Sequence, residues 1–454
     1  MDTTLATVNL LTDTRREHLE NAYQRMRTGM IPLFSSWRNS SHAEMLDASY
    51  REMLQLAASF PVDLARRMLE TLIRTRTFFD VLGDNLHKLH GPGFTGYQQE
   101  GVGVGVASAL RPDDFTATSH RDFSLHLFRG FSIDDAWLNH YLKKDGPTKG
   151  WHSNMHFFNQ HANDFGFQVS EMAMTTALLN GAVMSENMKR EREGGSPEDR
   201  AVGLAIFGDG ASSNGLTHEA VNFAKVRHIP ILEVILNNRI SFGTIGAKQH
   251  GDIDLVNRGI GYEMPGLSVD GNDVFMVSLA AHWLVSFIRR TSHPAVLECL
   301  TIRGHGHNEF DRNPYPQKLF GREEVRRWKT EIRFDPVKLT KETMLDLRLI
   351  SGDELEALER RITEEVETAE ERAFNAEDPP PDRAGLEEVF SDPGCRVSKD
   401  LAAAHPGAAG SRIITMREAY REALDEELAR NPDLRYMGED VEDPLGGAWG
   451  LTVG

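Results

Sequence analysis

The order of apolar and polar positions between residues 201 and 244 predicts one strand–helix–strand unit. A continuous apolar run at Ala201–Phe207 has the composition of a parallel strand that is buried on both faces. After a glycine turn, apolar residues recur at helical spacing until Pro230. A second run, Ile231–Leu236, then ends at Asn237–Asn238, so two buried strands flank one helix.

Apolar patterns on either side extend this unit into a larger fold. Because parallel strands are joined by helices that cover the sheet, the sequence predicts an α/β fold, a parallel sheet with helices on both faces, for residues 61–330. The further elements that it predicts are helices from Pro61 to about Leu89, from Val169 to Met188 and up to about Arg290, a strand and turn within Gly266–Val277, and a strand at Ala295–Thr301.

The composition of the rest of the chain divides it into four further segments. Residues 1–60 are expected to form a helical N-terminal extension, and residues 331–376 a helical appendage whose charge spacing suits an exposed helix. Residues 377–412 contain three successive prolines and an alanine-rich stretch, which predicts a linker. Residues 413–454 have the pattern of a helix, a short strand and a glycine-rich turn, as at the start of a second α/β domain.

The overall composition excludes several classes of protein. Of 454 residues, 40% are hydrophobic and 26% charged, which is ordinary for a globular protein and unlike a collagen or a disordered chain. The formal net charge of −18 argues against general binding to nucleic acid. The sequence has two cysteines and no apolar run of membrane-spanning length, so we expect a cytoplasmic protein that neither enters a membrane nor contains disulfides.

Two polar turns follow the predicted strands, and they contain residues that could bind a ligand. Open α/β sheets bind ligands at the carboxyl ends of their strands, so Asp209 and Asn238 are expected to meet there. A carboxylate and an amide oxygen suit a magnesium ion held to a phosphate, which Gly208 and Gly210 let the backbone approach. A tight turn with a capping aspartate remains an alternative. A dinucleotide site is disfavoured, because it would place an acidic residue where Asn238 stands.

Two further segments place polar residues within reach of a ligand. Arg121 follows a polar turn and can bind a diphosphate with paired donors, although a surface arginine is the alternative. His305 and His307 lie on a glycine-rich loop after a predicted strand, a position that suits a ligand better than a core. For His156 the sequence leaves two roles open, lining of the pocket and a structural role in the core. The six histidines between residues 120 and 161 include no convincing zinc pair.

The GDG turn, followed after 26 residues by Asn237–Asn238, resembles the signature of thiamine-diphosphate enzymes. The surrounding residues make the chain similar to the alpha-type half of the 2-oxo acid dehydrogenase (decarboxylating) component. The matching segments are Gln99–Glu100, His120–Arg121, Lys149–Phe158, the V-D-G-N-D run at 269–273 and the H-G-H run at 305–307. The resemblance covers residues 70–330 and implies a thiamine-diphosphate-binding fold.

The resemblance also implies roles for individual residues. By their positions, Asp209, Asn238 and the carbonyl of Ile240 would hold Mg²⁺, and His307 would face the cofactor and assist acyl transfer. His120 stands where the family has a tyrosine. The full set of residues implied in cofactor binding is His120, Arg121, Phe165, Gly208, Asp209, Gly210, Ala211, Asn238, Ile240 and His307.

The implied activity is thiamine-diphosphate-dependent oxidative decarboxylation of a 2-oxo acid, which is an oxidoreductase reaction. The acyl group would pass to a lipoyl group on the acyltransferase of a dehydrogenase complex. Phe94 stands where pyruvate-type relatives tend to have histidine, so a branched or bulkier substrate is expected in an apolar pocket. The alternatives are transketolase-like ketol transfer, an NAD-dependent dehydrogenase and a non-catalytic fragment.

Residues 413–454 resemble the opening of the beta-type subunit of the same enzymes. The family motifs T-V-R-E-A, G-E-D-V and G-G-A appear here as T-M-R-E-A, G-E-D-V and G-G-A. The I-S-E motif, whose glutamate activates the cofactor in the family, does not occur in this stretch. We therefore expect an alpha–beta fusion that is catalytically incomplete over residues 1–454. Assembly as a homodimer, or in a heterotetramer-like form, would join alpha and beta regions.

Overall fold

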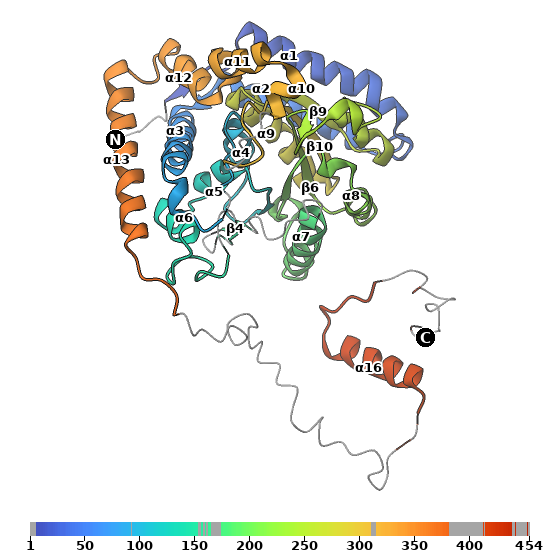
Figure 1. Cartoon of the computed structure of the whole chain (residues 1–454). Coiled ribbons are helices and arrows are strands. Elements are labelled where there is room, and N and C mark those ends of the chain that lie inside the picture. The colour runs from blue at the N-terminus through green and yellow to red at the C-terminus, as the bar shows by residue number, and fades with distance from the viewer. Residues whose placement is uncertain are drawn as a thin grey trace, which may run out of the picture. The chain divides into compact units, whose positions relative to one another are not determined.

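The computed structural model describes residues 6–91, 93–152, 156–157, 159, 162–164, 174–309, 315–380, 412, 414–437, 441 and 452. The chain divides into two compact units, Met1–Pro379 and Pro380–Gly454 (Figure 1). The second unit contains the described helix α16 (Met416–Arg430). This helix begins with a capping box, in which Thr415 and Glu418 each accept a hydrogen bond from the backbone of the other.

A six-stranded parallel sheet forms the centre of the first unit (Figure 1). The strand order is β4-β3-β5-β6-β10-β9, and every neighbouring pair is parallel. The predicted parallel sheet is therefore confirmed. The strands are β3 (Phe115–Ala117), β4 (Asn163–Asp164), β5 (Gly203–Gly208), β6 (Ile231–Asn237), β9 (Gly266–Asp270) and β10 (Ala295–Leu300).

The two central strands are buried on both faces, which explains their continuous apolar pattern. Along β5, Leu204 and Ile206 belong to the core on one face of the sheet, whereas Ala205 and Phe207 belong to the core on the other. This alternation follows from the two-residue period of a strand. Helices must therefore cover both faces.

The covering helices belong to the two cores. Helices α4 (Glu100–Ala107) and α9 (Val274–Thr291) pack on each other and contribute to the first core. Helices α7 (Met174–Arg192) and α8 (Gly215–Arg227) contribute to the second. Helix α8 lies between β5 and β6 in the chain, as the sequence predicts, and each of these helices buries an apolar face.

The described residues before α3, from residue 6 onward, contribute to the main core. Helix α2 (His42–Ala58) packs along α9, and the indole of Trp283 on α9 donates to the Leu46 carbonyl at 3.1 Å. Helix α1 (Asp13–Gln24) contributes Arg15, which forms an ion pair with Asp273 at 2.6 Å. Residues 6–60, for which the sequence offers no chemistry, thus help to build the fold that positions the site.

Further helices and short strands complete the first unit, with brief 3₁₀ and π-helical turns between them. They are β1 (Thr7–Val8), β2 (Phe60–Pro61), α3 (Val62–Asp84), α5 (Phe123–Phe128), α6 (Ile133–His140), β7 (Ile240–Ser241), β8 (Thr244–Ile245), α10 (Tyr315–Phe320), α11 (Arg322–Thr330), α12 (Pro336–Asp346) and α13 (Gly352–Phe374). Among the described helices, none combines the length and apolar character needed to cross a bilayer.

Candidate active site

The ends of β5 and β6 bring the two predicted polar turns together. Gly208 and Leu236 are paired across these strands, so Asp209 and Asn238 follow at the same edge of the sheet. Both line a cavity of about 130 Å³. The other lining residues are Gln99, Ser119, His120, Arg121, Gly208, Gly210, Ala211, Leu236, Ile240, Ser241, Phe242, Arg303 and His307. The remaining residue with an implied role in cofactor binding, Phe165, lies outside the described residues.

Asp209 is the carboxylate of this cavity. Its side chain is buried, and Oδ1 accepts hydrogen bonds from the Gly210 N–H at 2.9 Å and from the Ser241 hydroxyl at 3.3 Å. Oδ2 is also buried, and no described residue donates a hydrogen bond to it. Burial raises the pKa of Asp209, and a cation beside Oδ2 would oppose this effect. The unpartnered oxygen therefore has the chemistry of a metal ligand.

The turn after Asp209 leaves no room for a side chain. A Cβ added at Gly210 would lie 2.3 Å from Ser241 Oγ, which no real Cβ contact allows. The Ser241 side chain on β7 thus approaches the turn closely, and glycine is favoured at position 210 for steric reasons. Helix α8 begins shortly beyond, and its first residues are capped by the Asn214 side chain, which accepts from the Leu216 N–H at 2.9 Å.

Asn238 and Ile240 form the facing turn. Asn238 Oδ1 accepts from the Ile240 N–H at 3.2 Å, and Asn238 Nδ2 donates to Gln99 Oε1 at 3.4 Å. The Ile240 carbonyl accepts from Arg303 Nη1 at 3.3 Å, and another nitrogen of Arg303 donates to the Phe242 carbonyl. Arg303 was not predicted as a site residue. Its contacts depend on the fold, because it follows β10 while Ile240 follows β6.

Arg121 projects from a compact turn that holds its guanidinium in the cavity. Asp122 closes this turn by accepting from the N–H and the hydroxyl of Ser119, at 2.9 and 2.6 Å. Arg121 Nη1 donates to the Thr95 carbonyl at 2.9 Å, and Nη2 donates to the His307 carbonyl at 2.7 Å. Two residues far apart in the sequence, Arg121 and His307, are therefore in direct contact.

The lining of the cavity has a surplus of positive charge. Arg121 and Arg303 supply two guanidiniums, and Asp209 is the carboxylate among the described lining residues. Burial, together with the nearby charge of Arg303, lowers the pKa of Arg121 to about 9. Burial also lowers the pKa of His120 well below its usual value, so the ring is neutral near pH 7. A diphosphate would offset this surplus of charge.

Four rings gather beside these charges. The Phe94 ring lies 4.6 Å from that of His120 and 5.7 Å from that of His307, measured between centroids. The Phe242 ring lies 4.5 Å from that of His307. Phe242 is 55% exposed and so lies on the solvent side of the cavity. Phe94, on which the substrate prediction rests, thus contacts both histidines but does not itself line this cavity, and His156 does not line it either.

A buried polar network supports the turn that carries Arg121. His126 on α5 is hydrogen-bonded to Thr118 through Nε2 at 2.9 Å and to Asp164 through Nδ1. The Thr116 hydroxyl donates to the other oxygen of Asp164 at 2.7 Å. Sequence reasoning missed this network, because isolated polar residues on three elements show no pattern. The one available signal was the presence of polar residues at positions where β3 and β4 would be buried.

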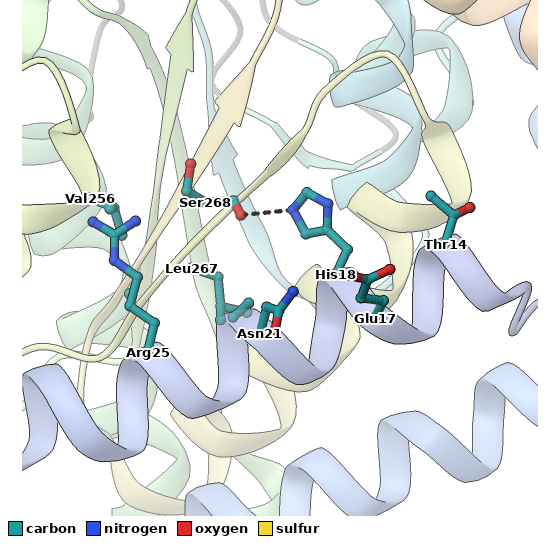
Figure 2. Close-up of a pocket in the computed structure, with 10 residues that line it drawn as sticks. Thr14, Glu17, His18, Asn21, Arg25, Val256, Leu267 and Ser268 are labelled. Atoms are coloured by element: carbon teal, nitrogen blue, oxygen red, sulfur yellow. Dashed lines mark hydrogen bonds between the residues drawn. The ribbon is translucent and has the colours of Figure 1, made fainter.

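A larger cavity of about 370 Å³ lies between α1 and the edge strand β9 (Figure 2). Figure 2 shows the His18 ring directed at the Ser268 carbonyl, 3.4 Å away. The lining includes one carboxylate, Glu17, and one guanidinium, Arg25, and shares no residue with the first cavity. No described polar atom of its lining is both buried and without a hydrogen-bond partner. Size alone therefore does not make it the candidate site.

Comparison with known proteins yields one family and several relatives. A sequence model of the dehydrogenase E1 component family matches residues 72–382. Pyruvate dehydrogenase E1 component subunit alpha of Rhizobium meliloti (strain 1021) is 30% identical over 311 residues, which cover 67% of this chain and 84% of that protein. The mitochondrial somatic form of this subunit in Homo sapiens is 28% identical over 299 residues, covering 66% and 72%. The alpha subunit of acetoin:2,6-dichlorophenolindophenol oxidoreductase of Bacillus subtilis (strain 168) is 28% identical over 314 residues, covering 68% and 89%.

Proposed function

Because this chain belongs to the dehydrogenase E1 component family, we propose that it is the alpha-type part of an oxidoreductase that decarboxylates a 2-oxo acid. The acyl product is transferred to a lipoyl group of a dehydrogenase complex. One observation supports this function above others. Asp209, with its unpartnered oxygen, meets Asn238 and two guanidiniums in a single cavity at the carboxyl ends of β5 and β6.

The residues of the cavity fit thiamine diphosphate and Mg²⁺. Asp209 Oδ2, the side-chain oxygen of Asn238 and the carbonyl oxygen of Ile240 are hard ligands of the kind that Mg²⁺ binds together with a phosphate. No group of three or more His, Cys, Asp or Glu side chains in the described part of the chain offers another metal site. When bound, thiamine diphosphate supplies a carbon nucleophile for the 2-oxo carbon and an electron sink for decarboxylation.

The protein's own groups bind, orient and exclude water. Arg121 and Arg303 would bind the diphosphate with charge-assisted hydrogen bonds. Neutral His120 lines the cavity with the Phe94 ring packed against it, and this apolar contact would help to exclude water from that side of the site. His307, whose carbonyl accepts from Arg121, can hold or donate a proton at a ring nitrogen during acyl transfer.

The proposal also includes a specific class of substrate and specific partners. The aromatic wall at Phe94 favours a branched 2-oxo acid over pyruvate, because each buried methylene contributes about 0.8 kcal/mol. The partners are a lipoyl-bearing acyltransferase and a beta-type region, to whose start residues 413–454 correspond. The three motifs in those residues support this fusion, and the family match ends earlier, at residue 382. A cytoplasmic location completes the proposal and is supported by the low cysteine content.

Ligand-dependent melting of the purified protein tests the cofactor. We expect thiamine diphosphate to raise Tm when Mg²⁺ is present and to have little effect without it, because the metal links Asp209 to the diphosphate. Stabilisation by NAD but not by thiamine diphosphate would refute the proposal.

Turnover with an artificial electron acceptor, measured with the beta-type region supplied, then tests the substrate class. The panel contains pyruvate, 3-methyl-2-oxobutanoate, longer 2-oxo acids, acetoin and sugar phosphates. Activity on 2-oxo acids supports the proposal. Activity on sugar phosphates alone would assign a transketolase-like reaction, and activity on acetoin alone would assign the reaction that the Bacillus subtilis relative is named for.

A further inference from the structure

Gln98, beside the candidate site, has a strained backbone. Its φ angle is +67°, in the left-handed region that favours glycine, and its side chain is only 4% exposed. A residue other than glycine in this region costs free energy and persists only where its surroundings fix it. Gln98 directly precedes Gln99, which lines the cavity. The side chain at this position must therefore make contacts that outweigh the strain.

The side-chain amide of Gln98 bridges two segments of backbone. Its Oε1 accepts from the Gly304 N–H at 3.1 Å, and its Nε2 donates to the Trp328 carbonyl at 2.5 Å. Nε2 also lies 3.4 Å from the Phe334 carbonyl. A Cβ added at Gly304 would lie 2.6 Å from Gln98 Oε1, so only glycine lets the loop come this close. Both ends of the amide are satisfied by main-chain groups, which gives the contact a fixed geometry.

The partner of Gln98 on α11 is itself anchored. Trp328 packs with Val325 on α11 and with Ile302, which follows β10, in a small separate hydrophobic cluster. Its indole N–H donates to Glu324 at 2.9 Å. Helix α11, drawn beside α10 and α12 in Figure 1, is thus fixed by these contacts. Gln98 connects the loop at Gly304 to this helix.

The segment before Gln98 runs along the loop that follows Gly304. The Tyr97 ring stacks on the His305 ring, with centroids 4.5 Å apart and an interplanar angle of 16°. Further along, the Glu309 N–H donates to the Gly93 carbonyl at 2.9 Å. The two segments are therefore in contact over their length, with Gln98 at the end nearer to β10.

We propose that Gln98 is a positioning residue, which fixes Gly304 and with it the loop that carries His307. The inference rests on the proposed function, because it assumes that the ring of His307 acts during acyl transfer. Beyond Gly304 the loop is held by Arg121, which donates to the His307 carbonyl at 2.7 Å. Without Gln98, Gly304 loses its hydrogen-bonded link to α11, and small displacements of a catalytic group reduce the rate strongly.

Two substitutions separate the side chain from the backbone strain. Gln98→Gly removes both hydrogen bonds and relaxes φ, whereas Gln98→Asn keeps an amide that tolerates this φ but is too short to bridge both partners. Arg348→Gly is the matched control. Arg348 has φ +56° and is exposed between α12 and α13. Its replacement by glycine therefore relieves the same kind of backbone strain at a position far from the site in the sequence.

Hydrogen exchange of the full chain is the first measurement, because it does not depend on activity. We expect amides in residues 301–309 to exchange at least ~10-fold faster in both Gln98 variants, while those of β10 keep their wild-type rates. Arg348→Gly should leave residues 301–309 unchanged. Wild-type exchange of this loop in both Gln98 variants would overturn the proposal, whether or not the protein acts on 2-oxo acids.

Kinetics is the second measurement, made with the beta-type region supplied and on the 2-oxo acid that wild-type protein then turns over best. We expect kcat to fall about 10-fold or more, while KM and the Kd for thiamine diphosphate change less than about twofold, because orientation is lost and binding is retained. Faster exchange with unchanged kcat would overturn the positioning role. If wild-type protein supplied with the beta-type region turns over no 2-oxo acid, the proposed function fails, and the exchange data alone decide whether Gln98 fixes the loop.

Discussion

Glu233 offers a quantitative test of how burial within the sheet acts on stability. The residue lies in the middle of β6 and is 1% exposed. The Thr176 hydroxyl donates to one carboxyl oxygen at 3.1 Å, and the other oxygen has no hydrogen-bond partner among the described residues. Burial raises the pKa of Glu233 from an ordinary value of 4.5 to about 8. The folded protein therefore keeps this carboxyl protonated at neutral pH.

The sign of the effect on stability follows from this pKa. The unfolded chain releases the proton near pH 4.5, whereas the folded protein holds it until about pH 8. The contribution of Glu233 to stability is thus complete below pH 4.5 and is lost as the pH rises toward 8. The difference is about 3.5 units, and at about 1.4 kcal/mol for each unit the loss has an upper limit of about 5 kcal/mol.

The variant Glu233→Gln tests this reasoning, because glutamine has nearly the same shape and does not titrate. Near pH 5 the free energies of unfolding of variant and wild type should differ by less than about 1 kcal/mol. Near pH 8.5 the variant should be more stable by several kcal/mol, measured by urea unfolding and by Tm. Glu219→Gln, an exposed change on α8, is the control and should show no such trend. An equal difference between Glu233→Gln and wild type at both pH values would refute the reasoning.

Three further predictions concern the cavity. Asp209→Ala removes its carboxylate, so calorimetric titration should show magnesium-dependent binding of thiamine diphosphate weakened by about 100-fold or more, and unchanged binding would contradict the metal site. Gly210→Ala places a Cβ 2.3 Å from Ser241 Oγ and should weaken the same binding about 10-fold, whereas Gly215→Ala, with open space around its Cβ, should leave it intact. His307→Ala should reduce lipoyl acylation far more than cofactor affinity, and an equal loss of both would argue against its role in acyl transfer.

The sequence alone determined the strands β5, β6, β9 and β10 of the sheet and the main turns of the site, because both depend on local pattern, whereas it did not predict the short strands β3 and β4. The runs at Ala201–Phe207 and Ile231–Leu236 are apolar at nearly every position, since β5 and β6 are covered on both faces. Asp209 and Asn238 follow these runs directly. A general rule of parallel sheets was then enough to predict that they share one edge. The prediction that Asp209 and Asn238 lie close together therefore did not depend on any other part of the chain.

Only the tertiary structure decided which distant groups complete the site. Arg303 reaches the Ile240 carbonyl across 63 positions of sequence, and Gln98 reaches Gly304 across 206. Residues 6–60 join the main core for the same reason, through contacts such as that between Trp283 and Leu46. The spacing of apolar residues predicts which face of an element is buried, but it does not predict which other element covers that face. The hydrogen-bond partners and pKa of a buried side chain depend on distances between elements, and those distances are set only when the chain packs.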